Sequence, residues 1–295
     1  MRMEVYFMNI NDPQKFNLVL KETVEKRLGD GYDVSFSEVK KITESYPSLC
    51  ILNLCGGIGY NINLEQLYGY YREGKSTEEC ADEIIERITG ALPFEVPDWL
   101  TDYDRVKQKL FIRVSDAEKN REILEGVPHH ECEGLAVTCH ILIHKGEEFA
   151  STMITKPFLN QYGITAEQLY EDAVKNSERI MPAQIVPLDA ACRMDDSCYS
   201  SHALVLTNQD MINGAAVVFY PGILEETAGM LGESFWLFPS SIHEMIAFAS
   251  ERISHPDEAK EILTDANRTV VSEEDQLSDT VYFYDAEEHR LHKAA

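Results

Sequence analysis

Short apolar segments follow one another in adjacent pairs along this chain, and amphipathic segments with helical spacing separate the pairs. The segments with strand-like patterns are 32–39, 49–54, 109–114, 135–144, 149–155, 203–206, 215–220, 235–238, 244–248 and 281–284. Strands joined by short connections pair in the antiparallel sense, because parallel strands need a long crossover between them. We therefore predict an α+β fold in which helices pack on antiparallel sheets, and a hairpin that joins 203–206 to 215–220 through 207–214.

Helix start signals stand where the apolar period is helical. Asp12 precedes Pro13 and predicts a helix that ends at Gly29, because aspartate caps helix starts and glycine commonly ends helices. Thr165 and Gln168 have the spacing of a capping box, which predicts a helix at 166–177. Further helices are predicted after the Ser76–Glu79 capping pair and at 222–231 and 256–266.

Two prolines punctuate the segment 181–187, just before the chain loses its basic residues. Proline is common where chains pass between compact units. We predict two closely packed subdomains, an amino-terminal one at 1–180 and an acidic carboxyl-terminal one at 181–295. The last residues, 289–295, are predicted to be frayed.

The charge balance excludes whole classes of partner. The chain has 51 acidic and 26 basic side chains, a formal net charge of −25. Nucleic-acid backbones and anionic membranes bind proteins through lysine and arginine, so neither is an expected partner. No apolar stretch approaches the roughly 20 residues that a membrane helix needs.

Cysteine usage points to a reducing compartment. The seven cysteines are an odd number and form no C-x-x-C pair. Scattered cysteines of this kind are typical of free thiols. The amino terminus also lacks the apolar region of a signal peptide, so we predict a cytoplasmic protein without a cofactor.

Acidic residues are unbalanced in the second half of the chain. Residues 151–295 carry 24 acidic and 9 basic side chains, and no lysine or arginine stands between Arg193 and Arg252. One interpretation is a solvated surface that keeps the protein in solution, and the other is a docking surface for a basic protein partner. The residues predicted to bind such a partner are Asp195, Asp196, Glu225, Glu226 and Glu233.

A group of histidines and cysteines lies between residues 129 and 144. His140 and His144 are four residues apart, so on a regular strand they share a face, and a turn can bring His129 and Cys132 toward them. Imidazole and thiolate are zinc ligands, and the alternative to a binding protein is therefore a metal-dependent hydrolase. The structural interpretation is a buried strand that happens to carry histidines.

Another polar group lies at 238–245, where Ser240, Ser241, His243 and Glu244 are neighbours. Nucleophilic catalysis needs a serine whose oxygen meets an imidazole held by a carboxylate, usually from separate elements. Residues this close in sequence rarely adopt that geometry, so we predict a turn.

Several blocks together resemble a known bacterial family. They are Pro128-His129-His130, the block 152–170, Asn176, the segments 206–208 and 213–216, Tyr220-Pro221-Gly222 and 238–244. Through these blocks the chain resembles the family called domain of unknown function 5688, and the likeness extends over about residues 13 to 285. The resemblance implies a cytosolic bacterial protein and brings no activity, cofactor or site residue. We favour a non-catalytic protein, and the sequence gives no prediction of its oligomeric state.

Overall fold

The computed structural model describes residues 12–40, 45–54, 59–90, 97–145, 149–192, 202–253, 255–269, 271–272 and 274–294. It divides into two compact units, residues 1–96 and 97–295. The predicted boundary at 180/181 differs from this division. The segment after the helix at 166–180 continues into the edge strand Ala183–Pro187, which pairs with Ala203–Asn208 inside the second unit, so both sides of the predicted boundary belong to one unit.

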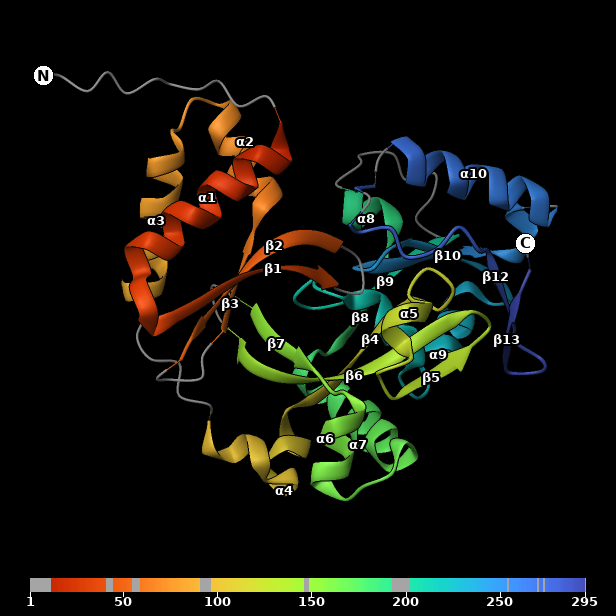
Figure 1. Ribbon diagram of the computed structural model, residues 1–295. Coiled ribbons are helices and arrows are strands. Elements are labelled where there is room, and N and C mark those ends of the chain that lie inside the picture. Colours follow the sequence, from red (N-terminus) through yellow and green to blue (C-terminus); the bar gives the residue numbers. More distant parts are fainter. Residues whose placement is uncertain are drawn as a thin grey trace, which may run out of the picture. The chain divides into compact units, whose positions relative to one another are not determined.

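The first unit is a three-stranded antiparallel sheet with helices on one face (Figure 1). Its core joins Phe16 and Leu20 of the first helix to Leu49 and Ile51 of the middle strand. Asp12 caps the first helix by accepting a hydrogen bond from the backbone of Gln14, as predicted. The elements are α1 (Pro13–Leu28), β1 (Tyr32–Lys40), β2 (Ser45–Asn53), β3 (Gly59–Asn63), α2 (Leu64–Arg72) and α3 (Thr77–Gly90).

Two antiparallel sheets make up the second unit. One has the order β4-β6-β5, with β7 also paired to β6, and the other has the order β13-β12-β10-β11-β9-β8. The strands are β4 (Leu110–Asp116), β5 (His129–Cys132), β6 (Leu135–Lys145), β7 (Phe149–Met153), β8 (Ala183–Pro187), β9 (Ala203–Asn208), β10 (Phe235–Ser241), β11 (Glu244–Ala249), β12 (Tyr282–Asp285) and β13 (Arg290–Lys293). All strand pairs among the described residues are antiparallel, so the α+β prediction is confirmed.

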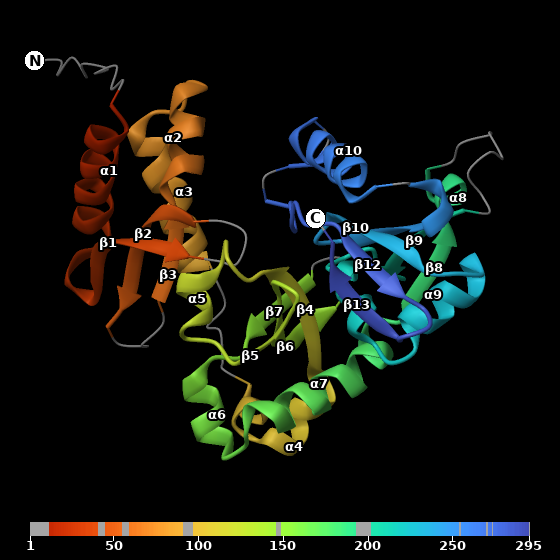
Figure 2. The ribbon, with the colours of Figure 1, turned by 90° about the vertical axis from the view of Figure 1, so that its right-hand side faces the viewer.

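Helices cover both sheets of this unit. They are α4 (Tyr103–Val106), α5 (Arg121–Leu124), α6 (Lys156–Tyr162), α7 (Ala166–Ile180), α8 (Leu188–Cys192), α9 (Ile223–Leu231) and α10 (Pro256–Thr269). Thr165 caps α7 by accepting a hydrogen bond from the backbone of Gln168, as predicted. Figure 2 shows α10 lying along the six-stranded sheet, where Leu263 packs against the face that carries Trp236 and Phe238.

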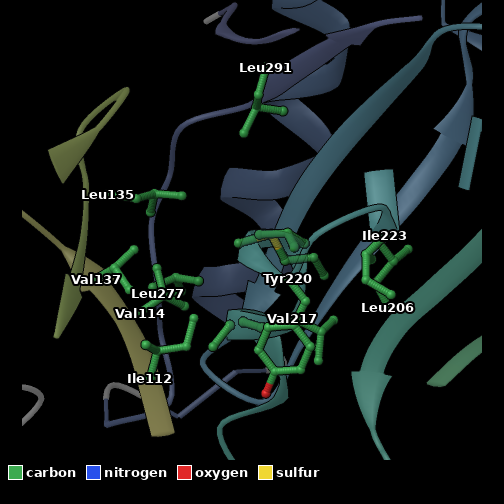
Figure 3. Close-up of a cluster of buried hydrophobic side chains, with 14 of the residues drawn as sticks. Ile112, Val114, Leu135, Val137, Leu206, Val217, Tyr220, Ile223, Leu277 and Leu291 are labelled. Carbon is green, nitrogen blue, oxygen red and sulfur yellow. The ribbon is translucent and has the colours of Figure 1, made fainter. Parts of the chain in front are cut away.

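One large core lies between the two sheets. Ile112, Val114 and Val137 of the smaller sheet face Val217 and Leu277 (Figure 3). We call the face of β4 with Leu110, Ile112 and Val114 the core face, and the opposite face, with Phe111, Arg113 and Ser115, the Arg113 face.

Two local predictions are wrong. Residues 214–219 form a 3-10 helix rather than a strand, because Gly214 packs directly against Thr207 and the carbonyl of His243 and leaves no room for a hairpin partner. Residues 290–293 form β13, paired with β12, where a frayed end was predicted.

Candidate functional site

His140 is enclosed within the smaller sheet. Its side chain is 4% exposed, its Nε2 lies 3.0 Å from Thr138 Oγ1, and its ring lies 5.6 Å from the Phe111 ring. Burial and the nearby Arg113 charge lower the pKa of His140 well below its ordinary value. This imidazole is therefore neutral, and its Nε2 is already hydrogen-bonded to the hydroxyl group of Thr138.

His144 lies on the other face of the same strand. Leu142 pairs with Ser151 but His144 pairs with Ala150, so β6 contains a bulge at Ile143. One extra residue reverses the alternation of side chains, because the period of a strand is two. The predicted common face of His140 and His144 is therefore wrong.

The remaining two candidate ligands also diverge. His129 pairs with Thr138 and lies on the Arg113 face, whereas Cys132 pairs with Leu135 of the core face. His129 Nδ1 is 2.9 Å from the carbonyl of Val127. No group of three or more His, Cys, Asp or Glu side chains arranged to hold a metal occurs in the described part of the chain. The structure thus separates the residues that the metal hypothesis needs together.

His243 is held by the backbone rather than by a serine. Its Nδ1 accepts a hydrogen bond from the backbone N–H of Asn213 at 3.1 Å, so its Nε2 carries the proton and donates it to Asp275 Oδ1 at 3.1 Å. Ser240 Oγ donates to Glu244 at 3.3 Å instead. An imidazole whose free lone pair is already occupied cannot accept a serine proton. This arrangement agrees with the predicted turn.

The acidic residues of the cation-free segment have different surroundings. Lys145 of β6 forms an ion pair with Asp210 at 2.5 Å, so a base from the first half of the chain neutralises this acid. Glu251 lies 3.9 Å from His202 Nδ1. Asp195 and Asp196 lie outside the described residues.

Two predicted acidic residues line one hollow beside α9. Glu225, in the first turn of the helix, and Glu233, just beyond its end, border a hollow of about 280 Å³. Its other lining residues are Ala228, Gly229, Gly232, Tyr284, Ala286 and His289. We call this hollow the acidic pocket. Glu226 is exposed on the same helix and does not line it.

Tyr284 provides the aromatic wall of the acidic pocket. Its ring stacks on Phe235 at 5.1 Å and its hydroxyl lies 3.5 Å from His289 Nδ1. Burial and the Glu225 carboxylate raise the pKa of Tyr284. Charge alone identified Glu225 and Glu233 in the sequence. Tyr284 and His289 were missed, because they lie far from α9 in the sequence and only the folding of the six-stranded sheet brings β12 and the residues after it beside that helix.

Comparison with known proteins gives a family and nothing more specific. A model of a family of unknown function, DUF5688, matches residues 13–286. No curated protein and no solved structure matches the chain. None of the helices among the described residues is long and apolar enough to cross a membrane.

Proposed function

Because the chain belongs to the DUF5688 family, whose function is unknown, we propose from its own geometry that it is a cytoplasmic binding protein without catalytic activity. It binds a basic segment of another protein, which places a lysine or arginine side chain in the acidic pocket. The observation that carries this proposal is that Glu225 and Glu233 line the same hollow, and that no lysine or arginine is among its lining residues.

The shape of the acidic pocket suits a long cationic side chain. Ala228, Gly229 and Gly232 leave space between the two carboxylates, and the buried Tyr284 lines the pocket beside them. A guanidinium group fits such a place, because it forms paired hydrogen bonds to carboxylates. Glu226, exposed beside the pocket, adds negative charge that attracts the rest of a basic segment.

The cytoplasmic part of the proposal rests on the cysteines. Cys50, Cys80, Cys132 and Cys139 all carry free thiols. Free thiols are typical of proteins in reducing compartments. The non-catalytic part rests on three histidines that do not converge on a reacting centre. Nε2 of His140 and both ring nitrogens of His243 already have hydrogen-bond partners, and His144 lies on the opposite face of β6 from His140.

The test uses the full chain and a fluorescein-labelled hexa-arginine peptide as the probe. Fluorescence anisotropy gives its Kd at 50 and 300 mM NaCl, and we expect binding to weaken as salt screens the charges. The double variant Glu225→Gln/Glu233→Gln should weaken binding about fivefold or more, as two partly solvated ion pairs are lost.

The matched control is Asp33→Asn/Glu65→Gln, which changes the net charge equally at exposed positions in the first unit. This control should change the Kd less than about twofold. An equal loss in both double variants would show that net charge alone attracts the peptide. That result, or binding that ignores salt, would refute the acidic pocket as the docking site.

A further inference from the structure

Arg113 lies in the middle of β4, on the face turned away from the large core. Its neighbours Ile112 and Val114 point into the core, and Thr138 of β6 is its direct cross-strand partner. Phe111 and Ser115, two positions before and after it, share its face. The sheet therefore presents one guanidinium group between an aromatic and a hydroxyl side chain.

The guanidinium group of Arg113 lies beside two aromatic rings that contact each other edge to face. Its central carbon lies 5.5 Å from the centre of the Phe111 ring and 5.7 Å from that of Phe149. Its Nη2 donates a hydrogen bond to Ser151 Oγ at 2.7 Å. Its Nε is enclosed and has no hydrogen-bond acceptor, and the same holds for Ser115 Oγ on the same face.

In the part of the chain that the structure describes, no carboxylate accompanies this charge. None of the ion pairs found among the described residues includes Arg113, although the chain has 51 acidic side chains. Burial lowers the pKa of Arg113 to about 10. His140, the titratable group beside it, is neutral and supplies no negative charge. Enclosed charges in proteins are normally paired, so an anion is the partner that the described surroundings of Arg113 lack.

We infer that Arg113 anchors a binding site for a small monocarboxylate with an apolar body. One guanidinium fork matches one carboxylate in geometry and in charge. The hydroxyl of Ser151 accepts from Arg113 and keeps its own hydrogen to donate to the ligand. Phe149, which is partly exposed, offers a ring against which the apolar body packs.

Charge and surroundings favour a carboxylate over a phosphate. Phosphate monoesters carry nearly two negative charges at neutral pH. On this face Lys145 is already paired with Asp210, which leaves one cation, Arg113, without a carboxylate among the described residues. The rings of Phe111 and Phe149 also favour a ligand that is apolar beyond its charged group. Inorganic phosphate is therefore the comparison ligand for the test.

The experiment measures the unfolding temperature and the binding isotherm of the full chain with benzoate, benzamide and inorganic phosphate. Benzoate should raise the unfolding temperature with a saturable dose dependence, because a ligand that binds only the folded state stabilises it. Benzamide, which has the same ring without the charge, should have no effect. Phosphate should bind at least about tenfold more weakly than benzoate.

Variants assign the site to Arg113. Arg113→Gln should lower benzoate affinity about tenfold or more, Ser151→Ala about threefold, and the exposed Arg268→Gln should leave it unchanged. If Arg113→Gln does not fold, Ser151→Ala and the benzamide comparison decide the matter. The inference is overturned if benzoate does not bind, if benzamide or phosphate binds as tightly, or if neither site variant weakens binding.

Discussion

Replacing Gly214 by alanine should destabilise the second unit strongly. A Cβ atom at this position would lie 2.3 Å from Thr207 Oγ1, 2.4 Å from the carbonyl oxygen of His243 and 2.8 Å from the backbone nitrogen of Asn208. Two of these atoms belong to the backbone, so β9 or the turn at His243 must move. The added methyl group also pushes apart Thr207 Oγ1 and the carbonyl oxygen of His243, which are joined by a hydrogen bond of 2.8 Å.

The expected loss follows from these two effects. Overpacking a tight interior costs about 1–3 kcal/mol, and an intramolecular hydrogen bond contributes about 1 kcal/mol. The sum, about 3 kcal/mol, corresponds to a fall in Tm of about 6–12 °C for a unit of this size.

Tryptophan fluorescence during urea or thermal unfolding is a suitable assay for Gly214→Ala. Both tryptophans of the chain, Trp99 and Trp236, belong to the second unit, so the signal reports that unit. The matched control is Gly229→Ala in α9, where a Cβ would meet nothing within 4 Å. There we expect a gain of about 0.5–1 kcal/mol, because alanine favours a helix over glycine. Equal effects of the two substitutions would refute the packing argument.

Three further predictions concern single side chains of the second unit. Burial lowers the pKa of His140, so when the pH falls below the unfolded-state pKa of about 6.5 only the unfolded state binds the proton. The free energy of unfolding should then decrease by up to about 1.4 kcal/mol for each unit by which the pH is lowered, and His140→Gln should reduce this dependence in urea titrations. Burial raises the pKa of Cys139 to about 12, so iodoacetamide at pH 8 should label Cys139 roughly a hundredfold more slowly than Cys50. Peptide mass spectrometry measures the two rates, and comparable rates would contradict the burial of Cys139. Thr165→Ala should cost about 1 kcal/mol by removing the α7 cap, whereas Thr155→Ala, whose side chain caps nothing in α6, should be near neutral by the same fluorescence assay.

The sequence predicted those elements whose signals are local. The caps at Asp12 and Thr165 and the capping box of Ser76 and Glu79 all form as expected, because each needs only residues a few positions apart. The helix α2 was missed: its start depends on Asn63 accepting hydrogen bonds from two backbone nitrogens, directly after a strand.

Features that depend on distant contacts were not predictable. The segment 214–219 is apolar enough for a strand, but its close packing against Thr207 and His243 decides its conformation. The division after residue 96 reflects two separate cores. Pro93 and Pro97 stand at this division as Pro182 and Pro187 stand at the predicted one, so proline positions alone do not distinguish the two boundaries. For the candidate site, charge identified Glu225 and Glu233, while the pairing of Asp210 with Lys145 required the fold.

The bulge at Ile143 decides the face on which the end of β6 presents its last side chains. Beyond it, Lys145 reaches the carbonyl of Ile180 at 2.7 Å and the carboxylate of Asp210. A strand that alternated regularly through Ile143 would turn Lys145 to the core face, and the tie between the smaller sheet and the end of α7 would be lost. Deleting Ile143 would remove only the extra residue, so Lys145 would stay opposite Phe149 and the tie should survive.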